Sequence, residues 1–266
     1  ELYIDGTKIE ANANRYTFVW RGSLNYHLAG LLDTIDALYT KYNAFLLDNG
    51  YGPKYDLGDA HMFVIEGMDK VRKIIQKNRE RKLTKHKKIP NKTIIEIYHC
   101  SPLEIRKLQK NLMRIAEGEG IEFVFGKGMR KPEIQKLYEG LEECGKRLME
   151  YKECFKIMGK DRNSYSKTDL EATFMRMKED HMMNGQLKPA YNVQIAVENY
   201  FIVHGYVSND RTDYNTLIPV LEKHRKAFGD KLEAVTADSG YCSEKNLLYL
   251  KENRIRSFIK LQDHEK

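Results

Sequence analysis

Residues 191–207 read YNVQIAVENYFIVHGYV, two runs of mainly β-branched and aromatic residues with a polar pair between them. The runs at 191–197 and 200–207 predict two β-strands, and the Glu198-Asn199 pair predicts the tight turn that joins them. Strands joined by so short a turn pair antiparallel. This hairpin therefore predicts the antiparallel part of a sheet.

The residues after the hairpin alternate between helix and strand patterns. They predict a helix capped by Thr212 over 213–228, a strand at 232–237, a helix capped by Ser243 that runs to Asn253, and a strand at 256–261. With residues 2–9 as the first strand, the order is βββαβαβ. Such an alternation predicts a mixed sheet with helices packed on it, so the fold class is α/β.

Residues 22–187 have a different, mostly helical pattern. Apolar residues between Leu24 and Leu46 recur at helical spacing over about six turns, and a second helix is expected at about 66–83. A third begins at 101–104 (Ser-Pro-Leu-Glu), which offers an N-cap, a proline in the first turn and a capping-box acid. A fourth runs from near Pro132 to about Met158, before Gly159. Residues 160–187 carry no assignable pattern.

These patterns predict two domains. Residues 1–21 and 188–266 form the sheet domain, and residues 22–187 form a large all-helical insertion between its first two long strands. The first strand should then pair with strands from beyond residue 190, despite the separation in sequence.

The positive charge of the chain is concentrated in one segment. The whole chain has a formal net charge of +7, whereas residues 70–92 hold eleven Lys or Arg against one acid, Glu80. Such a block attracts polyanions such as DNA by releasing their condensed counterions, although a solvated basic helix end explains it equally well. The cations of this basic segment are Lys70, Arg72, Lys73, Lys77, Arg79, Arg81, Lys82, Lys85, Lys87, Lys88 and Lys92.

The composition argues against several classes of protein. No apolar run approaches the ~18 residues of a membrane span, and no charged-then-apolar leader opens the chain. The four cysteines include no close pair of the kind that zinc knuckles and redox loops use. We therefore expect a cytoplasmic protein with no membrane contact. Because the chain starts at Glu1 and has a strand pattern at once, we expect a segment of a longer protein.

Two aspartates occupy strand positions suited to chemistry. Asp5 lies in the first strand on the face shared by Tyr3 and Thr7, and Asp238 follows the 232–237 strand. Taken singly, each is more typical of a turn or a helix N-cap. If the first and fourth strands are neighbours, the two carboxylates converge at one sheet edge, where α/β sheets present ligands. Carboxylate oxygens suit Mg²⁺, and a pair of such ions can assist phosphodiester chemistry.

Four segments resemble the DDE-type transposases of bacterial insertion sequences, in the branch whose ribonuclease H-like core is split by a long helical insertion. They are LYIDGTKIEANA (2–13), KTDLEAT (167–173), YNVQIAV (191–197) and TADSGYCSEKN (236–246). The resemblance covers essentially the whole chain. It implies a ribonuclease H-like mixed sheet, with Asp5 as the first catalytic acid and Asp238 as the second. The family usually has Pro after the Asp of the second segment, where this chain has Leu170.

The resemblance also implies what accompanies these two acids. The complete enzyme is expected to hold two Mg²⁺ or Mn²⁺ ions, bound by Asp5, Asp238 and a third acid, a Glu on a later helix. That Glu belongs well beyond the last strand, and Glu265 is too close to this strand to replace it. We therefore expect the third acid to lie outside this chain, and the fragment to be inactive or nearly so alone.

The implied reaction is metal-dependent cleavage of DNA strands at transposon ends, followed by strand transfer into target DNA. The partner would be double-stranded DNA, both transposon ends and target, and a homodimer on DNA is compatible with the resemblance. Two alternatives stay open, a ribonuclease H-like nuclease on the same core and a non-catalytic DNA-binding remnant of a transposase.

Overall fold

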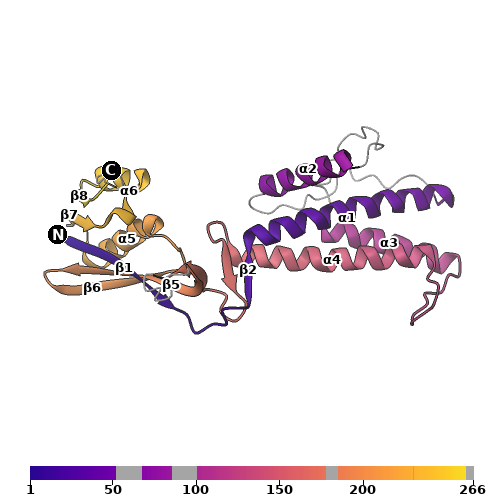
Figure 1. Cartoon of the computed structure of the whole chain (residues 1–266), viewed down its shortest axis with the longest axis horizontal. Coiled ribbons are helices and arrows are strands. Elements are labelled where there is room, and N and C mark those ends of the chain that lie inside the picture. The colour runs from indigo at the N-terminus through magenta and orange to yellow at the C-terminus, as the bar shows by residue number, and fades with distance from the viewer. Residues whose placement is uncertain (52–67, 86–100, 178–184, 230, 262–266) are drawn as a thin grey trace. The chain divides into compact units, whose positions relative to one another are not determined.

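Two compact units make up the chain, and each is described separately. Unit 1 consists of Glu1–Trp20 and Met158–Lys266, and unit 2 consists of Arg21–Ile157 (Figure 1). The structure is a computed structural model, and it describes residues 1–51, 68–85, 101–177, 185–229 and 231–261.

A mixed sheet forms the centre of unit 1. Its strands lie in the order β4-β5-β1-β7-β8, and β6 also pairs with β5. β5 is antiparallel to β1, β4 and β6, whereas β7 is parallel to both β1 and β8. This arrangement is compatible with the ribonuclease H-like core that the sequence predicts. The strands are β1 (Leu2–Glu10), β4 (Thr173–Arg176), β5 (Leu187–Glu198), β6 (Phe201–Ser208), β7 (Ala234–Ala237) and β8 (Arg256–Ile259).

The core of unit 1 lies between the sheet and two helices, α5 (Leu217–Phe228) and α6 (Glu244–Glu252) (Figure 1). Leu2 and Ile4 of β1 are buried in this core, whereas Tyr3 between them is half exposed. Successive side chains of a strand point to opposite faces of the sheet. The even-numbered residues at the start of β1 therefore face the helices, and Asp5 faces away from them.

The hairpin between β5 and β6 turns one residue later than the sequence suggests. Asn199 and Tyr200 have φ angles of 49° and 68°. Two successive residues with positive φ are typical of the two-residue type I′ turn, whose twist matches that of the strands. The helix expected from Asp213 also begins differently, with a short 3₁₀ turn, η2 (Asp213–Asn215), before α5.

The boundary between the two units lies near Met158 rather than near Lys188, where the helical pattern was expected to end. Two short strands, β2 (Phe18–Trp20) and β3 (Ser164–Ser166), pair with each other. β4 then pairs with the start of β5, with Thr173 opposite Ala190. The described residues after Met158 therefore belong to unit 1. Backbone pairing between distant strands decides this, because their local sequence has no clear helix or strand pattern.

Asp169 and Arg162 hold the loop before β4 in place. One oxygen of Asp169 accepts hydrogen bonds from the amides of Glu171 (3.1 Å) and Ala172 (3.2 Å), and the other accepts from the Tyr191 hydroxyl (2.7 Å). The Arg162 guanidinium donates to the carbonyls of Leu170 and Ala172. Asp169 thus has a structural role in this loop. It holds this role with Leu170 at the next position, where the resembling family usually has proline.

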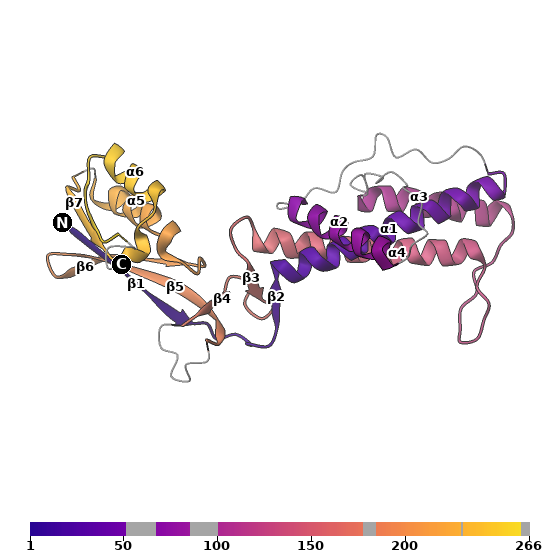
Figure 2. The same cartoon turned by 45° about the horizontal axis from the view of Figure 1, so that its top comes forward.

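Unit 2 is helical, with long helices running alongside one another (Figure 2). Ser101 caps α3 by accepting a hydrogen bond from the Glu104 amide at 3.3 Å, as the sequence predicts. Gly159 follows α4 with a φ of 61°, a conformation that ends helices. No helix within the described ranges is both long enough and apolar enough to cross a membrane. The helices are α1 (Arg21–Asp48), α2 (Met68–Lys85), α3 (Pro102–Gly118) and α4 (Glu133–Met158).

Candidate active site

The parallel pairing of β1 with β7 brings Asp5 and Asp238 to the same place. In this register Leu2 lies opposite Val235 and Ile4 lies opposite Ala237. Each aspartate is the next residue along its own strand, so the two follow the same paired position. Residues from opposite ends of the chain are joined here by backbone hydrogen bonds between neighbouring strands.

Both aspartates line one open groove of about 590 Å³ on the sheet. β1 contributes residues 3–7, β5 contributes Ile195 and Val197, and the end of β7 completes the wall. Both aspartates are exposed. The groove is therefore open to solvent, with both carboxylates accessible on its wall.

Each carboxylate is oriented by a backbone amide that follows it. The Gly6 amide donates to Oδ1 of Asp5 at 2.7 Å, and the Gly240 amide donates to Oδ1 of Asp238 at 2.9 Å. Asp238 is also the N-cap of the 3₁₀ turn η3 (Ser239–Tyr241). Asp238 thus both caps the 3₁₀ turn and lines the groove.

Comparison with protein families adds an independent observation. Residues 162–266 match the family model of the transposase DDE domain. This segment is similar to that domain. The matched segment contains Asp238 and every strand of the mixed sheet except β1, which the fold places beside β7. Searches against curated proteins and against solved structures found no match.

Beneath the groove, on the helix-covered face, unit 1 contains a buried polar cluster that local sequence patterns do not reveal. Gln194 and Asn192 of β5 are fully buried. The Gln194 side-chain nitrogen donates to Asn192 (2.8 Å) and to Oδ1 of Asp213 (3.1 Å), and Asn192 also donates to Asp213 (2.8 Å). The Gln194 oxygen accepts from the Tyr241 hydroxyl. The alternation of β5 identifies these side chains as inward-facing, but not their partners.

Tyr241 is the most perturbed titratable group of this cluster. Its side chain is fully buried, and this burial raises the pKa of its hydroxyl well above the ordinary value. The negative charges of Asp213, Asp238 and Asp5 raise the pKa further. The hydroxyl therefore stays protonated at neutral pH and donates its hydrogen bond to Gln194.

The two groove aspartates fit a hard divalent cation, though not a complete enzyme site. Mg²⁺ is commonly held by one or two carboxylates, with waters and substrate phosphate oxygens as its other ligands. Asp5 and Asp238 can supply the two carboxylates. Within the described ranges, no cluster of three or more Asp, Glu, His or Cys side chains suited to a metal ion occurs.

The basic segment lies partly on α2 of unit 2. Lys70, Lys73 and Lys77 are exposed on this helix, while Val71 and Ile75 are buried. Arg72, Arg79, Arg81, Lys82 and Lys85 are helical residues whose side chains are not described, and Lys87, Lys88 and Lys92 lie outside the described residues. The described lysines form a cationic helix face opposite an apolar one, which suits contacts with phosphates.

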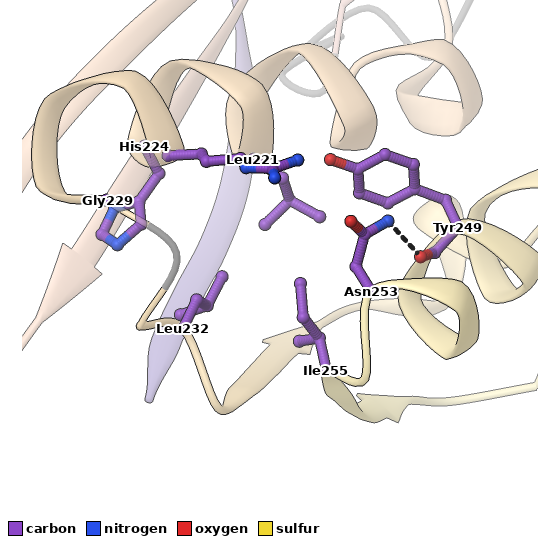
Figure 3. Close-up of a pocket in the computed structure, with 8 residues that line it drawn as sticks. Leu221, His224, Gly229, Leu232, Tyr249, Asn253 and Ile255 are labelled. Atoms are coloured by element: carbon purple, nitrogen blue, oxygen red, sulfur yellow. Dashed lines mark hydrogen bonds between the residues drawn. The ribbon is translucent and has the colours of Figure 1, made fainter.

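A second cavity of unit 1, of about 170 Å³, lies between α5, α6 and the start of β8 (Figure 3). Tyr249 lines it and donates its hydroxyl hydrogen to Glu222 of α5, and Asn253 donates to the Tyr249 carbonyl at 2.8 Å. Neither groove aspartate contributes to its wall. This cavity is therefore separate from the candidate active site.

Proposed function

We propose that this chain is part of an insertion-sequence transposase that cleaves DNA strands at transposon ends and transfers them to target DNA. The observation that carries the proposal is the register of β1 and β7, which puts Asp5 and Asp238 in one groove. The family of residues 162–266 supports the same reading. The helical unit is then an insertion in the catalytic core, after its first strand. A DNA substrate of this kind implies a cytoplasmic location.

In this proposal Asp5 and Asp238 would hold Mg²⁺ or Mn²⁺ in the groove. When bound, the metal ions would stabilise negative charge on the phosphate and lower the pKa of the attacking water or hydroxyl. Hydrogen bonds from the amides of Gly6 and Gly240 keep the carboxylates of Asp5 and Asp238 aligned. The open groove admits the DNA backbone, and the strands keep the two acids at a constant spacing.

The ligand count favours a second candidate for the chain taken alone, a DNA-binding fragment without cleavage activity. Two ions held by two carboxylates lack a ligand that fixes their geometry. A displacement of about 1 Å at a reacting group can lower the rate on the order of 100-fold. The chain is therefore expected to bind metal weakly and to leave DNA intact.

The basic segment supplies the proposed DNA contact. Contacts from lysine and arginine to phosphates provide affinity without reading base sequence. The exposed lysines of α2 and the buried apolar residues beneath them suit such a role. Binding should weaken steeply with salt and depend little on DNA sequence.

Mn²⁺ binding by the whole chain tests the placement of the metal site. Electron paramagnetic resonance would follow free Mn²⁺ during titration of the chain and of the D5N and D238N variants. We expect weak binding that each variant abolishes. Asp161→Asn is the matched control, because Asp161 is an exposed aspartate of the same unit that lies outside the groove. Equal binding by all four proteins would refute the proposed site.

Cleavage is tested with labelled duplex DNA carrying transposon ends, in Mg²⁺ or Mn²⁺, using the chain and its D5N and D238N variants side by side. Nicking that both variants abolish supports the transposase proposal, and DNA left intact supports the second candidate. Cleavage by the 266-residue chain that depends on Asp5 and Asp238 would show that a present acid completes the site. A nuclease would cut but would not join ends to target DNA.

A further inference from the structure

Gln194 lies on β5, the neighbour of the strand β1 that carries Asp5. It pairs with Gly6 across β1 and β5, so its neighbour in the sheet is the residue directly after Asp5. Its side chain accepts the hydrogen bond of Tyr241, which ends the turn that Asp238 caps. A single buried side chain therefore contacts both segments.

The orientation of the Gln194 amide is determined by Asp213. An ionised carboxylate only accepts hydrogen bonds, and Asp213 Oδ1 faces the side-chain nitrogens of both Asn192 and Gln194. The nitrogen of Gln194 must therefore point to Asp213, and its oxygen must point to Tyr241. Tyr241 is left as the donor, which agrees with a hydroxyl that stays protonated.

Close packing at both glycines makes this connection stiff. A Cβ atom at position 6 would collide with the side-chain amide of Gln194. A Cβ atom at position 240 would lie 3.0 Å from Oδ1 of Asp238 and 3.3 Å from Oδ2 of Asp213. Asp238 and Asp213 thus flank Gly240, and the backbone at both Gly6 and Gly240 packs closely against side chains that belong to or adjoin the amide cluster.

We propose that Gln194 and Tyr241 are positioning residues, which fix the spacing between Asp5 and Asp238 from the far side of the sheet and so set the metal affinity of the groove. This inference rests on the proposed function, because it takes the groove as a divalent-metal site. Groups that orient metal ligands typically change metal affinity 10- to 100-fold when they are altered. The hydroxyl of Tyr241 is the smallest part of the connection that can be removed.

The test compares Tyr241→Phe with Tyr249→Phe in the whole chain. Each substitution removes one hydroxyl that donates to a side chain of unit 1, but Tyr249 lies at the cavity of Figure 3, away from the groove. Mn²⁺ affinity is measured by paramagnetic resonance. Hydrogen exchange of the Gly240 amide, which closes the Asp238 turn, is measured by NMR without metal.

We expect Tyr241→Phe to weaken Mn²⁺ binding about 10-fold or more and to speed exchange at Gly240, while Tyr249→Phe leaves both unchanged. Wild-type values for both measurements in Tyr241→Phe would overturn the inference, as would equal changes in the two variants. If Gly240 exchange is faster but the wild-type chain binds Mn²⁺ no better than D5N, the connection is supported and the proposed metal site is refuted.

Discussion

Gly6 packs directly against the side chain of Gln194, its partner across β1 and β5. A methyl group at position 6 has no room, because it would meet the buried amide that hydrogen-bonds with Asp213 and Tyr241. The residue beside a candidate metal ligand is thus a glycine for reasons of packing. This glycine was not identified as important from the sequence.

Replacing Gly6 with alanine should destabilise unit 1 by about 1–3 kcal/mol, because overpacking displaces neighbours that have their own hydrogen bonds. Trp20, the single tryptophan of the chain, lies in unit 1, so its fluorescence during urea unfolding follows that unit. Gly205→Ala is the control in the same sheet, because its new Cβ would be at an ordinary 3.5 Å from its nearest neighbour. Equal stability of the two variants would contradict the packing argument.

Asp169→Ala should also destabilise unit 1, by about 1–3 kcal/mol, since hydrogen bonds to charged groups contribute this much. The variant loses two hydrogen bonds from backbone amides to the Asp169 carboxylate in the loop before β4, and the hydrogen bond from the Tyr191 hydroxyl. Phe174 of β4 packs on Trp20, with ring centroids 5.7 Å apart, so the fluorescence maximum should shift as well. Asp161→Ala, at an exposed position, should change stability by less than about 0.5 kcal/mol. No difference between the variants would refute the structural role of Asp169.

The stability of unit 1 should fall as the pH drops below about 6.5. Burial lowers the pKa values of both His204 and His224. The positive charges of His224 and Lys223 lower the pKa of His204 further, whereas the negative charge of Glu198 raises the pKa of His224. The folded state therefore takes up fewer protons than the unfolded state just below pH 6.5, which favours unfolding there. Above this pH both states hold neutral histidines, and this contribution is complete.

Urea unfolding at pH 7.5 and 5.5 measures this dependence. His204→Val should reduce the pH dependence, because it removes one of two imidazoles with lowered pKa values, whose ring centroids are 5.5 Å apart. His27→Gln, on an exposed position of α1, should leave the dependence unchanged. A wild-type chain that is equally stable at both pH values would contradict this prediction.

Reversing charge on α2 should weaken DNA binding for every duplex sequence alike. The variant replaces Lys73 and Lys77 with glutamate. The slope of log affinity against log salt concentration should be smaller in magnitude by about 2, one for each lost phosphate contact. Lys136 and Lys152 are exposed on α4, and their replacement by glutamate gives the same net charge. Fluorescence anisotropy with labelled duplexes at several salt concentrations separates the two. Equal effects would mean that only net charge matters.

Local sequence patterns predicted most of the elements. The hairpin of β5 and β6, the two helix–strand units that follow it and the cap of α3 all depend on residues close together in the chain. Propensity and capping determine such local structure. The choice of Asp5 and Asp238 also came from local positions, one on the outer face of a strand and one at a strand end. Their proximity needed the further assumption that the two strands are neighbours.

The amino-acid sequence by itself determined the alternation of strands and helices, the basic segment and the two aspartates that stand out from it. Only the tertiary structure decided that β3 and β4 join the sheet unit, and that Gln194 connects Gly6, Asp213 and Tyr241 beneath the groove. The reason is physical. Tyr241 and Gln194 are 47 positions apart, and a hydrogen bond between them depends on strand register and helix packing, which no local pattern encodes.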